Sequence, residues 1–164
     1  MTSVLTVLNV GDDLCYRIPV MEHAGLCVVR SRCSVTAVQR ALTPGSSFSG
    51  IVFHTEIDAA VQAAASAARQ LSTAPLILFQ NSSARRDERL FDLVIPAQTP
   101  PVVWLKSLQD AISEARDLCE KHQKLCQDFA NLRSTSAELR RKAAGNRDHH
   151  IDIDALWRGK PRHE

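Results

Sequence analysis

A histidine closes one of the apolar runs of the chain. Residues 49–54 read Ser-Gly-Ile-Val-Phe-His, and a polar segment follows before an alanine-rich stretch. A short apolar run between turn signals is typical of a strand buried in a parallel sheet. The carboxyl end of a central strand in such a sheet faces the crevice where ligands bind. His54 is therefore the first candidate for chemistry, either as a nitrogen that accepts a phosphoryl group or as an inert polar strand end.

Two acidic residues, Asp12 and Asp13, follow the first apolar run. Carboxylates at a turn can ligate a divalent cation, but the same residue types also form turns and cap helices. The preceding residue is Gly11, which offers no ligand, so we predict no metal site here. His149 and His150 stand near two aspartates without the fixed spacing of metal ligands, and they predict only a flexible charged tail.

The chain carries no motif of an enzyme or of a cofactor site. Its glycines are too scattered to form a loop that cradles phosphates. Ser82 and Ser83 lack the G-x-S-x-G pattern of a nucleophile elbow. We therefore predict a protein without catalytic activity and without a cofactor.

Composition narrows the class of protein further. A chain of 164 residues with 45% hydrophobic residues fits one globular domain with an appendage. A net charge of +2 and 5% aromatic residues give little support to nucleic-acid binding. The five cysteines have no C-x-x-C spacing, and no run reaches the roughly 18 apolar residues of a membrane span. These features predict a cytoplasmic protein with reduced thiols and no membrane partner.

Strand and helix patterns alternate over the first two thirds of the chain. Within 14–23, Arg17 shares a helix side with Ile18 and Met21. Pro19 in the same segment implies a kink or a late helix start. Such alternation predicts an α/β fold, a five-stranded parallel sheet doubly wound by helices on both faces. The predicted strands are 4–10, 26–30, 49–54, 75–79 and 91–95, and the predicted helices are 14–23, 35–42 and 59–71, with a short charged turn at 85–89.

No glycine or proline occurs between residues 102 and 144, which predicts one long helix that ends at Gly145 and Asn146. Apolar residues recur along it at spacings of three and four for about five heptads, the pattern of a coiled-coil seam. The predicted division is a domain at 1–117, a helical extension at 118–144 and a flexible tail at 145–164. His122 is either a polar residue that sets the register of the seam or a partly solvated one. The predicted oligomerisation residues are Leu118, His122, Leu125, Phe129, Leu132 and Leu139.

The order and spacing of these segments resemble the receiver domain of bacterial response regulators, over roughly residues 3–120. Segment 7–12 looks like the first strand of that family with its acidic turn. Segment 51–54 lies where the family has the strand that ends in the phospho-acceptor aspartate. Segments 24–29, 75–80 and 92–96 look like the entry to the second strand, the fourth strand and the fifth strand. The resemblance implies a flavodoxin-like, receiver-type fold and a place in two-component phosphorelay signalling.

The same resemblance implies a degenerate phosphorylation pocket. A glycine replaces the first acidic residue, a histidine the acceptor aspartate, a glutamine the hydroxyl residue and an isoleucine the lysine. Phosphoryl transfer needs carboxylates around Mg²⁺ and electrostatic support beside the transferred group. Asp92 stands where the switching aromatic residue of the family is expected. The positions that correspond to the pocket are Gly11, Asp12, Asp13, His54, Gln80 and Ile95.

These observations predict a non-enzymatic signalling and interaction protein, a pseudo-receiver that binds protein partners and self-associates in parallel through its long helix, as a homodimer. An alternative is an atypical phosphorelay receiver that is still phosphorylated in a two-component system. A further alternative is an RNA-binding regulator of the antiterminator type. The helical module of that class is a compact bundle with glycine-containing turns, and residues 102–144 contain no such break.

Overall fold

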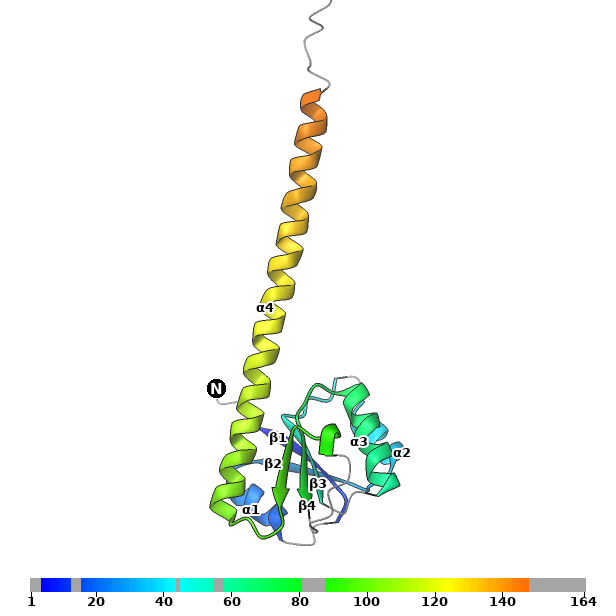
Figure 1. Ribbon diagram of the computed structural model, residues 1–164, viewed down its shortest axis with the longest axis vertical. Coiled ribbons are helices and arrows are strands. Elements are labelled where there is room, and N and C mark those ends of the chain that lie inside the picture. Colours follow the sequence, from blue (N-terminus) through cyan, green and yellow to red (C-terminus); the bar gives the residue numbers. More distant parts are fainter. Residues whose placement is uncertain (1–3, 13–15, 44, 55–57, 81–87, 148–164) are drawn as a thin grey trace, which may run out of the picture. The chain divides into compact units, whose positions relative to one another are not determined.

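The first part of the chain folds around a five-stranded parallel sheet. The computed structural model describes residues 4–12, 16–43, 45–54, 58–80 and 88–147, with side chains up to residue 144. The strands are β1 (Thr6–Val10), β2 (Cys27–Ser31), β3 (Gly50–His54), β4 (Leu76–Gln80) and β5 (Leu93–Pro96), in the order β2-β1-β3-β4-β5. All neighbouring strands are parallel (Figure 1). The predicted fold class is confirmed.

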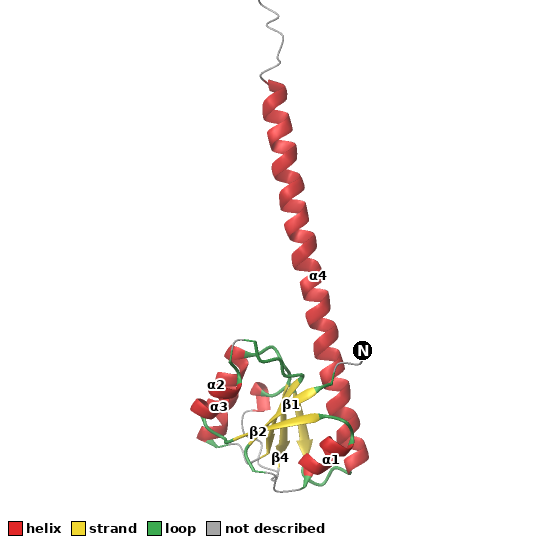
Figure 2. Ribbon diagram, turned by 180° about the vertical axis from the view of Figure 1, so that it is seen from behind, coloured by secondary structure: helices red, strands yellow, loops and turns green. Residues whose placement is uncertain are grey.

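Helices cover both faces of the sheet. Helices α2 (Val35–Ala41) and α3 (Ala59–Leu71) lie on one face, and α1 (Arg17–His23) and the first turns of α4 (Pro101–Arg147) lie on the other (Figures 1 and 2). Between β4 and β5, the described residues form only the 3₁₀ turn η1 (Glu88–Leu90). The chain divides into two compact units, Met1–Cys119 and Glu120–Glu164.

The core consists of two apolar layers, one on each face of the sheet. Side chains alternate along each strand, so Ile51 and Phe53 pack toward α2 and α3 while Val52 packs toward α1 and α4. Small alanines of α3, among them Ala64 and Ala68, are fully buried against the sheet. This packing explains why the β3 sequence reads as a continuous apolar run.

Side-chain caps fix the starts of two helices. Ser34 Oγ accepts a hydrogen bond from the amide of Ala37 at 3.2 Å and caps α2. Asp58 Oδ1 accepts from the amide of Val61 at 2.8 Å and caps α3 in the same way.

Two predicted helix bounds differ from the structure by more than one residue. Helix α1 begins at Arg17, so Pro19 is its third residue, where the missing amide hydrogen costs no helical hydrogen bond. Leu14, the predicted start, lies outside the described residues. The prediction that the long helix ends at Gly145 and Asn146 was wrong, because α4 continues to Arg147. A glycine inside a helix lowers the stability of that helix by only about 1 kcal/mol, so the last turn of α4 can include Gly145.

Candidate functional site

His54 is the last residue of the central strand β3, at the position predicted from the sequence. Its side chain is only 3% exposed and lies in register with Phe79 of β4. The two rings stack with centroids 4.9 Å apart and planes 15° apart. The imidazole is therefore packed against a neighbouring aromatic ring, inside the protein, rather than presented at an open crevice.

A buried arginine completes this cluster. Arg17 of α1 is 3% exposed, and its guanidinium carbon lies 3.9 Å from the centre of the Phe79 ring. Its Nη2 donates a hydrogen bond to the carbonyl oxygen of Ala97 at 3.1 Å, just after β5. Trp104 of α4 packs edge-on against the same ring, with centroids 5.2 Å apart. Phe79 thus gathers a guanidinium, an imidazole and an indole at the carboxyl end of the sheet.

The sequence contained a signal for this arrangement. Arg17 lies four residues before Met21 on the apolar side of α1, and a charge at such a position must be paired when it is buried. The contact with Ala97 could not be inferred, because it joins groups 80 residues apart in sequence.

The acidic corner of the candidate pocket is only partly formed. Gly11 adopts a φ of +97°, and its amide donates to the carbonyl oxygen of Ser31 at 2.9 Å. Asp12 is exposed, and Asp13 lies outside the described residues. Asn9 is fully buried on β1 and donates from Nδ2 to the carbonyl oxygen of Gly11 at 3.1 Å. In the part of the chain that the structure describes, no three residues of the types His, Cys, Asp and Glu form a group that could hold a metal.

The remaining pocket positions lie on β4 and β5. Gln80 ends β4, half-buried, in register with Pro96. Ile95 is buried in the layer that faces α1 and α4, in register with Phe79. An aliphatic core side chain therefore lies at the position where the resemblance to receiver domains implies the counterpart of a lysine. The structure brings His54 and Ile95 onto either side of Phe79.

Asp92 lies at the other edge of the sheet, immediately before β5. Its Oδ2 accepts a hydrogen bond from the amide of Leu76 at 2.8 Å and an ion-pair hydrogen bond from Arg69 Nη2 at 2.9 Å. Arg69 also donates to the carbonyl oxygen of Leu90 at 2.9 Å. At the position where a switching aromatic was expected, a carboxylate instead ties α3, β4 and the start of β5 together.

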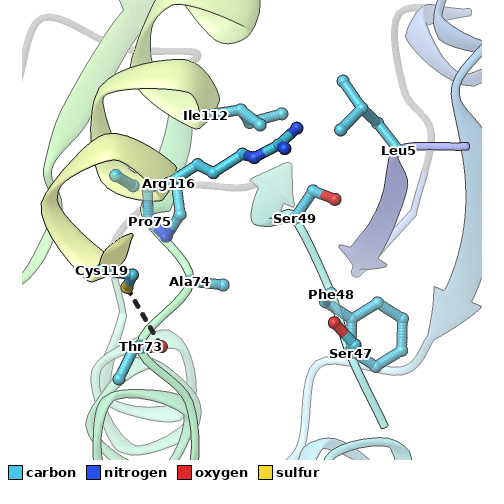
Figure 3. Close-up of a pocket in the computed structure, with 11 residues that line it drawn as sticks. Leu5, Ser47, Phe48, Ser49, Thr73, Ala74, Pro75, Ile112, Arg116 and Cys119 are labelled. Carbon is cyan, nitrogen blue, oxygen red and sulfur yellow. Dashed lines mark hydrogen bonds between the residues drawn. The ribbon is translucent and has the colours of Figure 1, made fainter. Parts of the chain in front are cut away.

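Two hollows of the first unit lie at the amino edge of the sheet, away from His54. One, of about 260 Å³, is lined by the loops before β3 and β4 and by α4; Ile112 and Arg116 extend across it toward Leu5 and Ser49 (Figure 3). The other, of about 390 Å³, is lined by Arg69, Asp92 and the α4 residues 111–119. Between them, Cys119 Sγ contacts Thr73 Oγ1 at 3.9 Å. Sequence reasoning did not predict these hollows, because they arise from loops that meet only in the folded chain.

Cys33 is a partly buried thiol close to the carboxyl edge. Burial raises the pKa of Cys33 above its usual value, and the negative charge of Asp58 raises it further. The thiol is therefore less reactive at neutral pH than an unperturbed cysteine.

The predicted oligomerisation residues lie on the exposed surface of α4. Leu118, Leu125, Phe129, Leu132 and Leu139 are between 59% and 68% exposed. We call these five side chains the apolar stripe. His122, also exposed, lies beside it, with Nε2 3.5 Å from Cys126 Sγ. No helix within the described ranges is long and apolar enough to cross a membrane.

Comparison with known proteins identifies the fold. No protein-family model and no curated protein matches the sequence. A CheY-like response regulator receiver domain from Methanospirillum hungatei JF-1 matches with a TM-score of 0.57 and 14% identity, over 70% of this chain and 98% of that one. Further receiver domains match with TM-scores from 0.51 to 0.55. The chain therefore has a flavodoxin-like, receiver-type fold.

Two other solved structures share this architecture. An adenylate cyclase structure from Rhodopirellula baltica matches with a TM-score of 0.61 and 12% identity, over 75% of this chain and 98% of that one. A fusion that carries a trimeric coiled-coil segment from yeast matches with a TM-score of 0.59 and 14% identity, over 85% of this chain and 99% of that one.

Proposed function

We propose that this chain is a non-enzymatic signalling protein, a receiver-type domain without a phospho-acceptor aspartate that acts by binding proteins and self-associates through α4. The apolar stripe is the observation that carries the proposal. Its leucines recur every seven residues, at 118, 125, 132 and 139, and Phe129 lies four residues after Leu125. This is the spacing of a coiled-coil seam, in which each side chain inserts between residues of a facing helix.

The size of the apolar stripe supports a partner of the same kind. A large apolar side chain stabilises by about 1.5–3 kcal/mol when it is fully buried. Two copies contribute ten such side chains that are 59–68% exposed, and burial of that exposed fraction offsets the roughly 4–15 kcal/mol cost of bringing two chains together. The match to the yeast coiled-coil fusion covers 85% of this chain, whereas the match to the receiver domain from Methanospirillum hungatei covers 70%. This supports a division of labour between a binding domain at 1–117 and an associating helix at 118–144.

The carboxyl edge of the sheet supports a role without phosphoryl transfer. The ring of His54 is enclosed by the protein, and Ile95 offers no charge to the developing phosphoryl group. A glycine at position 11 removes one carboxylate that would hold the metal. The domain would then signal through its surface rather than through a covalent modification.

Sedimentation equilibrium of the full chain tests the proposal. We expect an oligomer at micromolar concentration, and a monomer for a chain that carries Leu125→Asn and Leu132→Asn. The matched control is Lys124→Asn with Gln127→Asn, two exposed positions of the same helix outside the apolar stripe, which should leave the mass unchanged. A wild-type monomer at these concentrations would overturn helix-mediated association.

Incubation with acetyl phosphate tests the absence of phosphoryl transfer. Intact-mass analysis should show no phosphorylated species of the wild-type chain. A phosphorylated species that disappears in His54→Ala would support the alternative of an atypical phosphorelay receiver and would refute a purely binding role for this edge.

A further inference from the structure

Two opposite charges flank the predicted seam of α4, one on each side. The seam consists of a leucine row, which is the four leucines of the apolar stripe, and a second row of His122, Phe129 and Ser136. Asp128 directly precedes Phe129 and lies on one flank, whereas Arg133 directly follows Leu132 and lies on the other. Both charged side chains are exposed, and neither forms an ion pair within the described residues of one chain. A single helix therefore leaves both charges available to a partner.

A second, identical helix meets these charges in one direction of pairing. In a parallel pair the two-fold axis runs along the coil, so the flank before the second row of one copy faces the flank after the leucine row of the other. Without a shift between the copies, Asp128 of one helix lies opposite Arg133 of the other, and the symmetry repeats the contact. In an antiparallel pair each flank faces its own kind, so Asp128 and Arg133 do not meet.

The remaining flank residues favour the unshifted parallel pair. Its other facing pairs within residues 118–144 are Lys121 with Cys126 and Thr135 with Arg140. Neither of these pairs brings like charges together. A shift of one copy by one heptad would set Lys121 against Arg133 and Lys142 against Arg140, so like charges would meet twice. Facing like charges are destabilising, so the flanks disfavour the shifted pair.

We infer that Asp128 and Arg133 determine the partner of α4, which is a second copy of this chain, parallel and unshifted, joined by an Asp128–Arg133 ion pair on each flank. The inference rests on the proposed self-association and names the residues that decide its partner and direction. Exposed ion pairs add little stability, so the apolar stripe supplies the affinity and the two charges supply the selectivity. A helix with other flank charges is rejected by repulsion.

Charge reversal in the full chain tests the assignment by sedimentation equilibrium. Asp128→Arg alone, or Arg133→Asp alone, turns both attractive contacts into repulsive ones and should raise the dissociation constant by roughly 5–30-fold. The chain with both changes restores the ion pairs with exchanged signs and should regain the wild-type value. An equimolar mixture of the two single variants should also associate as tightly as the wild type. The matched controls are Asp117→Arg and Lys124→Asp, exposed positions of the same helix off both flanks, which should change the constant by less than about twofold.

Oxidative cross-linking tests the direction of the pair independently. In the unshifted parallel pair, position 136 of one copy lies opposite position 136 of the other, as a disulfide between two cysteines there requires. A full chain with Ser136→Cys, Cys119→Ser and Cys126→Ser should therefore form a disulfide-linked dimer. Ala137→Cys in place of Ser136→Cys is the matched control, because it lies outside the seam and should give little cross-linked dimer.

The results separate this inference from the proposed function. A wild-type monomer would overturn both. A wild-type oligomer whose dissociation constant is unchanged by Asp128→Arg would overturn the inference and leave self-association standing. The same conclusion would follow if the doubly reversed chain bound the wild type as tightly as it binds itself, or if Ala137→Cys cross-linked as readily as Ser136→Cys.

Discussion

Replacement of Asp92 by alanine should destabilise the first unit by about 1.5–3 kcal/mol, most of it from one backbone hydrogen bond. The Oδ2 atom of Asp92 accepts from the amide of Leu76, a fully buried residue at the start of β4, at 2.8 Å. A buried donor that loses its partner costs about 1–3 kcal/mol. The ion pair with Arg69 joins side chains that are 39% and 44% exposed, and such a pair contributes at most about 1 kcal/mol.

Two variants separate these contributions in urea unfolding. Asp92→Asn keeps an acceptor oxygen for the Leu76 amide and should cost no more than about 1 kcal/mol. Arg69→Met removes the ion pair and should also cost no more than about 1 kcal/mol. Fluorescence of the buried Trp104 reports unfolding of the domain when Trp157 is replaced by phenylalanine. If Arg69→Met proved as costly as Asp92→Ala, or Asp92→Ala cost less than about 0.5 kcal/mol, the backbone bond would not be the main contribution.

Three further predictions concern the carboxyl edge. Gly11→Ala and Gly45→Ala both replace a glycine with a φ of +97°, and each should destabilise the first unit by about 1–2 kcal/mol. Gly11→Ala should have the larger effect, because its new methyl group meets a backbone oxygen at 3.4 Å. Equal urea unfolding midpoints for the two variants would contradict this. Arg17→Met should cost about 1–3 kcal/mol in the same assay through the lost carbonyl and aromatic contacts, and a change below about 0.5 kcal/mol would show that the buried guanidinium is dispensable. Asp58→Asn keeps the helix cap and removes the charge that raises the pKa of Cys33, so the pH midpoint of thiol labelling should fall; an unchanged midpoint would leave burial as the only cause.

The strand pattern could be predicted because each central strand is buried on both faces. Residues 51–53 and 76–79 are apolar without interruption, and parallel strands covered by helices require that composition. Helix α3 was predicted with the bounds that the structure shows, 59–71, because its alanines have a strong helix preference. Helix ends without such a signal were less predictable. The start of α1 depends on Tyr16, which adopts a left-handed backbone conformation that could not be predicted from the residue type.

The candidate site was predictable in position and less so in its contacts. His54 was placed at the end of a central strand because strand order and polarity follow from the alternation of elements. Its stacking on Phe79 depends on the register between β3 and β4, which residue patterns do not fix. The role of Asp92 was missed because it depends on a backbone amide 16 residues away. Every residue type other than proline has a backbone amide, so the sequence does not show which amide a side chain will bind.

Helix α4 begins with turns that are already held in place. Trp104, Leu108 and Ile112 are buried in the core layer of the first unit, so the sheet fixes the backbone of this segment. Forming the first turn is the unfavourable step in making a helix, with an equilibrium factor of about 10⁻³, whereas each later residue adds a hydrogen bond. The domain therefore acts as a nucleus from which the helix extends through the exposed residues 120–144. The free energy of local opening should decrease along α4 toward its carboxyl end, and pairing of the apolar stripe would level that gradient, so that amide exchange along one helix reports whether a second chain is bound.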